Sequence, residues 1–173
     1  KLYRSESLVQ LAWVEASFRV GPDTKCLFHI YKGNLDAFEA GGRRRRSTAA
    51  ELALGCARNG DMLMVATIQS DNEAYQGEFR VPDADGNPRK WPVDGEFHSV
   101  RFERADNDGG NQGRFEIFLD DELVTLPDVD EFILSGLRAT SGNYTLGFLV
   151  DADAGASVDV AIEQVRLERT VGR

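Results

Sequence analysis

The segment from 97 to 124 constrains the fold of this chain more than any other stretch. Apolar and polar residues alternate over Phe97–Arg104 and again over Arg114–Leu119, and a cluster of Asp, Asn and Gly residues separates the two runs. Alternation with a period of two residues around turn-forming residues is typical of an antiparallel β-hairpin. We therefore expect His98 and Phe102 to share one face, because successive strand side chains point to opposite sides.

The rest of the chain shows the same two-residue rhythm. Strand-like runs occupy 6–20, 26–31, 49–57, 61–69, 75–81, 144–150 and 157–168, whereas 82–92 is a Pro-rich loop and 127–137 a short helical turn. About nine to twelve strands with closely spaced turns and almost no helix are typical of sandwiches and jelly rolls. The sequence predicts an all-β fold, a two-sheet antiparallel β-sandwich of the jelly-roll type, as a single domain over 1–173.

The last strand-like run needs an irregularity to keep its apolar residues on one side. A bulge near Glu163–Gln164 would shift the alternation by one residue. We expect this bulge to bring all of the apolar residues of the run to the core side, namely Val158, Val160, Ile162, Val165 and Leu167.

Charge and hydropathy limit the possible partners. The net charge of −9 opposes binding of nucleic acid or of an anionic membrane through the whole surface, since both need a positive field. No apolar run approaches the ~18 residues that a membrane-spanning helix needs. The chain begins at Lys1, so we expect a trimmed mature protein or a module of a larger one, secreted or at the cell surface.

The two cysteines, Cys26 and Cys56, are too few for a disulfide scaffold or a zinc site. They lie on two candidate strands joined through 40–42, and position 41 is the midpoint between them. If this hairpin forms, the two residues face each other across it. Two interpretations remain open, a disulfide and a pair of buried free thiols.

Several of these segments resemble a known superfamily. The residues FHSV at 97–100, a Gly-rich turn and FEIFLDDELV at 115–124 resemble the pattern W-H-x-V … G … L-Y-V-D-G-x-L-V of laminin-G-like domains. Those domains belong to the concanavalin A-like lectin/glucanase superfamily. Leu27–Ile30 is similar to its early L-F-x-L strand and Val160–Leu167 to its closing I-D-x-V-R-L strand. The resemblance implies a two-sheet jelly roll with one concave face, and its packing motifs indicate a fold rather than an activity.

Enzymes with this fold carry signatures that are weak or absent here. The E-x-D-x-x-E strand of family-16-like glucanases is missing, and Glu116 with Asp120 is a poor substitute. The start at Arg4 resembles the R-[ST]-E strand of alginate-lyase-like jelly rolls, although Leu8 replaces its final Arg. A lyase needs a base, an acid and a group that offsets the substrate carboxylate. His29, Tyr31 and Arg4 are the candidates for those roles, but we favour a chain without catalytic residues.

Basic and aromatic residues are the candidate ligand contacts. Four arginines follow a Gly pair, Arg43, Arg44, Arg45 and Arg46. Arginine pairs with carboxylate and sulfate in a bidentate manner, so this loop can hold an acidic polysaccharide. It can equally be a solvated hairpin tip or a cleavage site. Among the aromatic residues, Tyr31, Tyr75 and Trp91 are candidates for stacking on sugar rings, with Trp91 exposed in its loop and Trp13 in the core.

Three acidic clusters are candidate calcium sites, since calcium takes six to eight oxygen ligands. The first comprises Asp83, Asp85 and Asn87, the second Asp106 and Asp108, and the third Asp151 and Asp153. Residues of these types are also ordinary turn formers, and the first cluster lacks the downstream Glu of an EF-hand.

The sequence as a whole favours a non-catalytic carbohydrate-binding or adhesion module of a secreted or surface protein, with an acidic polysaccharide as one possible ligand and calcium as one possible cofactor. One alternative is a polysaccharide-active enzyme, either alginate-lyase-like or glycosidase-like. The other is a structural or assembly module whose partners are further protein modules.

Overall fold

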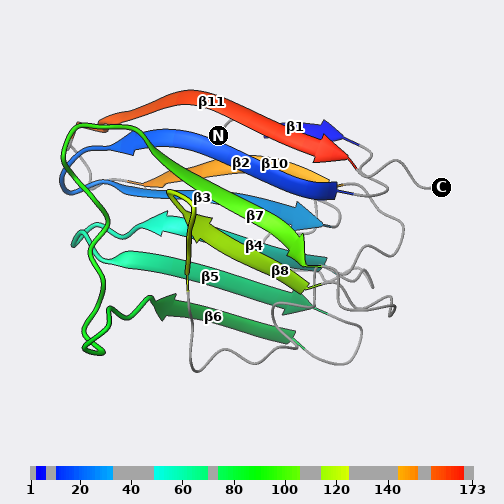
Figure 1. Ribbon diagram of the computed structural model, residues 1–173, viewed down its shortest axis with the longest axis horizontal. Helices are drawn as coiled ribbons and strands as arrows, with labels where there is room; N and C mark the ends of the chain where they lie inside the picture. The colour runs from blue at the N-terminus through cyan, green and yellow to red at the C-terminus, as the bar shows by residue number, and fades with distance from the viewer. Residues whose placement is uncertain are drawn as a thin grey trace.

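The computed structural model describes residues 3–6, 11–32, 49–69, 74–105, 114–124, 144–151 and 157–169. All of the regular structure in these residues is β (Figure 1). The strands are β1 (Tyr3–Glu6), β2 (Leu11–Val20), β3 (Lys25–Lys32), β4 (Ala49–Cys56), β5 (Met62–Gln69), β6 (Ala74–Arg80), β7 (His98–Ala105), β8 (Arg114–Leu119), β9 (Glu122–Leu123), β10 (Tyr144–Asp151) and β11 (Val160–Arg169). The predicted strands at 49–57 and 61–69 are confirmed as β4 and β5.

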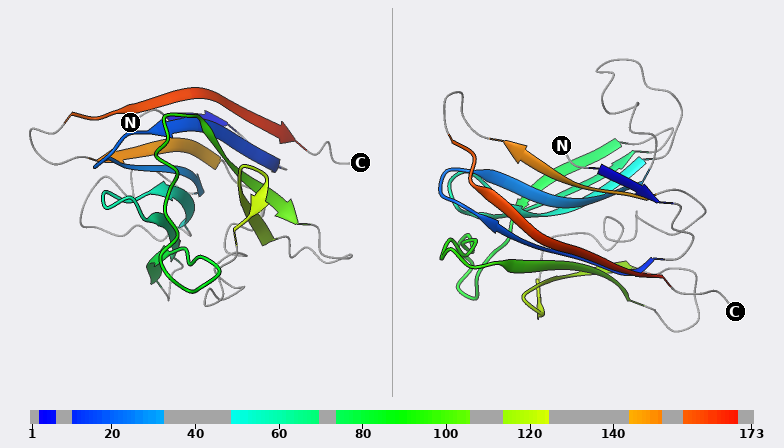
Figure 2. Two further views of the ribbon diagram at one scale, coloured as in Figure 1. Left: turned by 60° about the vertical axis from the view of Figure 1, so that its left-hand side comes forward. Right: turned by 90° about the horizontal axis from the view of Figure 1, so that it is seen from above.

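The strands form two antiparallel sheets that pack face to face (Figure 2). The six-stranded sheet has the order β1-β10-β3-β4-β5-β6, and the five-stranded sheet has the order β11-β2-β7-β8-β9. Phe18, Phe28, Phe102 and Phe148 meet between the sheets with ring centroids 5.1–5.6 Å apart. Apolar burial of this kind is the main stabilising contribution in a sandwich. The predicted two-sheet jelly-roll sandwich is confirmed.

The predicted hairpin at 97–124 forms β7, β8 and β9, with Val100 opposite Leu119 and Phe102 opposite Ile117. Asp120 and Asp121 make the tight turn into β9 with φ values of 50° and 65°. Two consecutive left-handed residues are the signature of the hairpin turn whose twist matches that of the strands. Asp tolerates this conformation better than most residues because its short polar side chain can hydrogen-bond to the nearby backbone. The side chain of Asp120 also accepts a hydrogen bond from the backbone amide of Ser99 on the neighbouring strand.

The Pro-rich segment after β6 is a loop, as predicted, but the expected exposure of Trp91 is wrong. Trp91 is 2% exposed and stacks on Phe18 with ring centroids 5.1 Å apart. The loop is tied to the six-stranded sheet by backbone hydrogen bonds from Met62 to Arg89 and from Trp91 to Gly60. It therefore crosses the end of the sandwich, where a large apolar side chain is driven into the core.

Asp61, a buried carboxylate, fastens the same loop. It contacts Lys90 at 2.5 Å and Arg80 at 3.3 Å, and it accepts a hydrogen bond from the Asn59 amide group at 2.7 Å. The hydrogen bond from Lys90 is the main cause that lowers the pKa of Asp61, and burial opposes it. The carboxylate is thus held charged at the start of β5.

Strand β11 confirms the predicted bulge but not the predicted burial. The register shifts between Ile162 and Gln164, and the shift keeps Ile162 opposite Phe18 and Val165 opposite Ala16 on the core side. However, Ile162 is 37% and Val165 45% exposed. The reason is that β11 is the edge of its sheet and has ten residues, whereas β1, the edge strand nearest to it in Figure 1, has four. Val158 precedes the strand and is 54% exposed.

The other expectation for the core was also wrong. Trp13 lies on the outer face of the five-stranded sheet, opposite Glu103, and its indole N–H donates to Glu168 at 2.5 Å. The helical turn expected at 127–137 lies outside the described residues, and the single domain over 1–173 stays a prediction. Among the described residues there is no helix with the length and hydropathy to span a bilayer.

Candidate functional site

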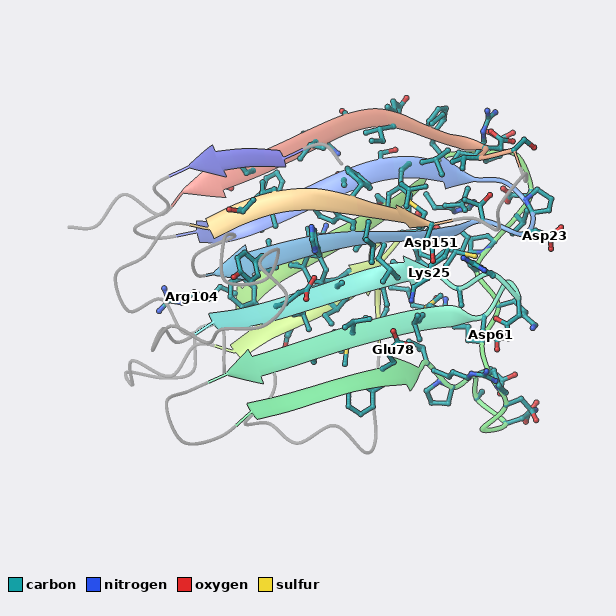
Figure 3. The ribbon with its side chains drawn as sticks, turned by 180° about the vertical axis from the view of Figure 1, so that it is seen from behind. Asp23, Lys25, Asp61, Glu78, Arg104 and Asp151 are labelled. Carbon is teal, nitrogen blue, oxygen red and sulfur yellow. The ribbon has the colours of Figure 1, made fainter. Side chains whose placement is uncertain are left out.

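The outer face of the six-stranded sheet collects polar side chains in one row. Facing residues of neighbouring strands share a side of the sheet. The register places Thr145 of β10, Tyr31 of β3 and Glu51 of β4 opposite one another. We call these three residues the polar row. Figure 3 shows the six antiparallel strands of this sheet side by side.

His29 lies one row away and reaches the polar row through a diagonal contact. Its Nδ1 and the Oε1 of Glu51 share a hydrogen bond of 2.6 Å, although His29 is directly opposite Ala53 rather than Glu51. The side chains of His29 and Glu51 are 11% and 19% exposed, whereas Tyr31 and Thr145 are 3% and 4% exposed. Glu51 is therefore the most exposed of these four side chains.

Tyr31 is a neutral hydrogen-bonding group at any physiological pH. Burial and, second to it, the nearby negative charge of Glu51 raise the pKa of its phenol to about 12. Both causes disfavour the phenolate. Tyr31 is thus well suited to exchange hydrogen bonds with a polar ligand and poorly suited to remove a proton from one.

Beyond His29 the outer face becomes apolar and flat. Leu27, Ala53, Leu63 and Val65 form a second cluster of buried residues on this side of the sheet. Gly147 and Ala53 are directly opposite His29 on its two neighbouring strands. The His29 imidazole therefore has no bulky neighbour directly opposite it, although its side chain is only 11% exposed.

Several predicted contacts lie elsewhere. The register pairs Arg4 with the core residue Leu146 and not with a residue of the polar row. Tyr75 is paired with Ile68, and its side chain is outside the described part of the structure. Arg43, Arg44, Arg45 and Arg46 lie outside the described residues, and Trp91 is in the core.

The nearest acidic neighbour of Glu51 on the described part of this face is Glu78, two strands away and in the adjacent row. The carboxylate of Glu78 is already engaged, because it is paired with Lys25 at 3.2 Å.

The predicted calcium loop at Asp83 uses its oxygens internally. Oδ1 of Asp83 accepts hydrogen bonds from the amides of Asp85 at 3.0 Å and Asn87 at 2.8 Å. The described residues contain no group of three or more His, Cys, Asp or Glu side chains arranged for a metal ion. Asp106, Asp108 and Asp153 are outside them. Calcium binding by this chain stays a prediction.

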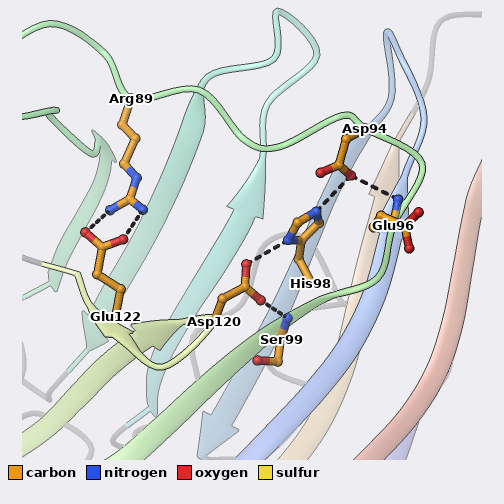
Figure 4. A network of polar contacts seen from close by, with 7 residues as sticks. All are labelled: Arg89, Asp94, Glu96, His98, Ser99, Asp120 and Glu122. Atoms are coloured by element: carbon orange, nitrogen blue, oxygen red, sulfur yellow. Dashed lines mark hydrogen bonds and ion pairs between the residues drawn. The ribbon is translucent and has the colours of Figure 1, made fainter.

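A groove of about 490 Å³ opens beside that loop, between the end of β6 and strand β9. It is lined by Val81, Pro82, Asp83, Ala84, Arg89, Glu122 and Leu123. Arg89 crosses it to form a two-point ion pair with Glu122, at 3.2 and 2.7 Å (Figure 4). These charges satisfy each other, so the groove offers a ligand fewer polar groups than the polar row.

His98 joins a second network, shown in Figure 4. Its two ring nitrogens contact Asp120 at 2.7 Å and Asp94 at 3.0 Å. Burial is the largest single influence and lowers the pKa of His98, but the two carboxylates together outweigh it and the pKa is raised. The pKa of Asp94 is lowered, mainly by its hydrogen bond with His98. This network joins the loop before β7 to the β8–β9 turn and has a structural role.

Sequence reasoning missed Glu51, although a signal for it exists. The hairpin symmetry about position 41, which pairs Cys26 with Cys56, also pairs Tyr31 with Glu51. Along the same strand Leu52, Leu54 and Cys56 belong to the core between the sheets, whereas Ala53 belongs to the cluster on the outer face. Together these patterns place a carboxylate beside Tyr31 and close to His29.

Comparisons with known proteins agree with this architecture. A mixed-linkage-glucan GH16 of Bacteroides ovatus, solved with an oligosaccharide product, matches with a TM-score of 0.55 at 13% identity, over 95% of this chain and 71% of that chain. A GH16 endo-glucanase of the same organism gives 0.53 at 13% identity, over 95% and 71%. A Bacillus licheniformis β-glucanase gives 0.51 at 7% identity, over 94% and 66%.

No family model matches the chain, and no curated protein matches it by sequence. The structural likeness defines the class of fold, which is a two-sheet jelly-roll sandwich like that of these glucanases. At 7–13% identity it establishes the fold and leaves the activity open.

Proposed function

We propose that this chain is a non-catalytic carbohydrate-binding module of a secreted or surface protein, and that it binds its glycan along the polar row. The observation that carries the proposal is the hydrogen-bonded His29–Glu51 pair beside Tyr31 and Thr145. Such a set offers one charged acceptor and several neutral hydrogen-bonding groups next to an apolar floor. Sugar rings present the same combination of hydroxyl groups and apolar faces.

The fold supports the proposal because two of the similar structures were solved in complex with the G4G4G3G product and with G4G3G-2F-DNP. Two features favour binding over catalysis. The described part of the face has one carboxylate in the polar row, and the raised pKa of Tyr31 removes it as a base.

The test is a binding titration by calorimetry against neutral and anionic polysaccharides. We expect Glu51→Gln to weaken binding at least tenfold, since a hydrogen bond to a charged group contributes about 1.5–3 kcal/mol, and Tyr31→Phe to weaken it about threefold to tenfold, since a neutral hydrogen bond contributes about 0.5–1.5 kcal/mol. Glu103→Gln, which makes the same change on the outer face of the five-stranded sheet, is the matched control and should bind normally. No heat with any polymer, or equal affinities for all variants, would contradict the proposal.

The same titration decides whether the ligand is acidic. If the arginines at 43–46 bind an anionic polysaccharide, the affinity for that polymer should fall steeply as the salt concentration rises, and it should be lost when all four are replaced with Gln. If the polar row alone suffices, a neutral polymer should bind with little dependence on salt.

A uronate lyase is the second candidate, because His29 and Tyr31 do share one face and both lie beside Glu51. It predicts a rise in ultraviolet absorbance from an unsaturated product, abolished in His29→Ala. The absence of any rise on uronate polymers would exclude it. If the chain binds no polymer and instead forms oligomers in size-exclusion chromatography, the assembly-module alternative is favoured.

A further inference from the structure

Cys26 and Cys56, the two cysteines of the chain, are directly opposite each other on β3 and β4. Both are present as thiols in the structure, and both are buried in the core between the sheets. We propose that they are the two halves of a cross-strand disulfide, which forms when the chain folds in the presence of a disulfide oxidant. This proposal concerns the covalent link between strands β3 and β4, and it does not depend on the proposed function.

The backbone geometry suits the bond. Directly opposed residues of antiparallel strands have Cα atoms about 4.5 or 5.5 Å apart, and disulfides span Cα separations of about 4.4–6.8 Å. The two side chains belong to one core cluster, so they leave the sheet on the same side. The strands also approach closely here, because a Cβ on Gly55 would lie 2.0 Å from the carbonyl oxygen of Cys26.

The chemistry is a two-electron oxidation. Two S–H bonds break and one S–S bond forms, and the pair of thiols loses two electrons and two protons. A small-molecule disulfide, such as oxidised glutathione, accepts them and is reduced to two thiols. The first step is attack by a cysteine thiolate, which gives a mixed disulfide, and the second cysteine then displaces the small thiol.

Burial of the two thiols determines when the disulfide can form. Burial and then the neighbouring Cys56 raise the pKa of Cys26 to about 12, and burial and then Asp61 raise that of Cys56 to about 11. In the native protein the reactive thiolate is therefore scarce, and the sulfurs are shielded. We expect oxidation during folding, before β3 and β4 are covered, and slow exchange afterwards.

The bond would fix the register of the candidate site. The pairing of Cys26 with Cys56 is the same register that sets Tyr31 opposite Glu51. A slip of one residue would move every side chain of β4 to the other face. A covalent link at the far end of this strand pair therefore holds the polar row in line.

The experiment is oxidative refolding of the full chain. Reduced, denatured protein is refolded with a mixture of oxidised and reduced glutathione and quenched with acid, and the folded monomer is isolated, alkylated in denaturant, and analysed by intact mass and by peptide mapping without reductant. We expect the folded monomer to be unalkylated and about 2 Da lighter than the reduced chain, with a Cys26–Cys56 linked peptide. Folded monomer that retains two alkylatable thiols, or that carries glutathione only, would overturn the proposal.

A second measurement covers the case in which oxidation perturbs folding. The oxidised wild type should melt about 5–10 °C above its reduced form, and the double variant Cys26→Ala/Cys56→Ala should show no difference between the two conditions. The folded, reduced protein should also react about a hundredfold more slowly with a thiol reagent than the denatured chain does. Equal melting temperatures for the two wild-type forms would count against the bond.

Discussion

The outer faces of the two sheets use polar residues in different ways. On the five-stranded sheet, Arg101 contacts Glu103 at 3.1 Å and Asp121 at 2.5 Å, lies 3.8 Å from Glu15, and covers the ring of Phe118. Glu15 is also paired with Arg166 of the edge strand. On the six-stranded sheet, the polar row contains one carboxylate next to the hydroxyl groups of Tyr31 and Thr145, with His29 beside it.

From this difference we infer that the five-stranded face mainly stabilises the fold, whereas the polar row mainly offers groups to a ligand. Opposite charges that match one another across strands stabilise a sheet and leave little for a ligand. A row of hydrogen-bonding groups around one carboxylate contributes less to folding and more to recognition. We therefore expect substitutions on the five-stranded face to alter stability alone, and substitutions in the polar row to alter binding first.

The largest expected change in stability tests how closely strands β3 and β4 of the six-stranded sheet approach each other. Gly55→Ala places a Cβ against the backbone of Cys26, where no rotamer change can relieve the contact. The strands must separate, and we expect a loss of about 3 kcal/mol in the free energy of unfolding, measured with denaturant. Ala53→Gly, on the same strand and face, is the control and should cost about 1 kcal/mol. A Gly55→Ala variant as stable as the wild type would show that the face is more pliable than the structure indicates.

A smaller change in stability is expected for the buried carboxylate of Asp61, which lies just before β5. Asp61→Asn keeps the shape but removes the charge that Lys90 and Arg80 contact, and should cost about 2 kcal/mol at neutral pH. Because the pKa of Asp61 is lowered in the folded state, its contribution is present above pH 3.8 and is lost as the pH falls through the folded-state pKa. Unfolding curves between pH 2 and 7 should therefore converge for wild type and variant at low pH. Curves that stay parallel would contradict this assignment.

The central prediction for the five-stranded face concerns Arg101. Arg101→Met retains much of the contact with Phe118 and removes the charge beside the buried carboxylate of Glu15. Since Arg166 still pairs with Glu15, we expect a loss of about 1 kcal/mol in stability and no change in glycan affinity. Arg58→Met, which removes an exposed pair with Asp151, is the control and should be nearly neutral. A change in affinity for Arg101→Met would break the separation between the two faces.

The smallest effect concerns His98, which lies outside both faces. Its raised pKa means that the stability it contributes is complete below pH 6.5 and is lost as the pH rises through the folded-state pKa. Melting temperatures measured across this range should decline slightly for the wild type and stay level for His98→Gln. A wild-type profile that rises over the same range would show that burial, and not the two carboxylates, controls this histidine.

Strand positions were predictable because alternation records which side of a strand meets the core. The hairpin of 97–124, the pairing of Cys26 with Cys56 and the bulge in β11 all follow from local spacing. The positions of Trp91 and Val165 did not follow. Whether an apolar residue in a loop or on an edge strand is covered depends on what the other sheet places against it.

The sequence by itself determined most of the strands and the antiparallel hairpins that join neighbouring ones, because a two-residue period acts over short distances along the chain. Only the tertiary structure decided that Glu51 reaches His29, that Arg4 is paired with Leu146, and that Trp91 closes the end of the core. Those outcomes depend on contacts between segments far apart in sequence, and no local pattern encodes the order in which six strands are arranged in a sheet.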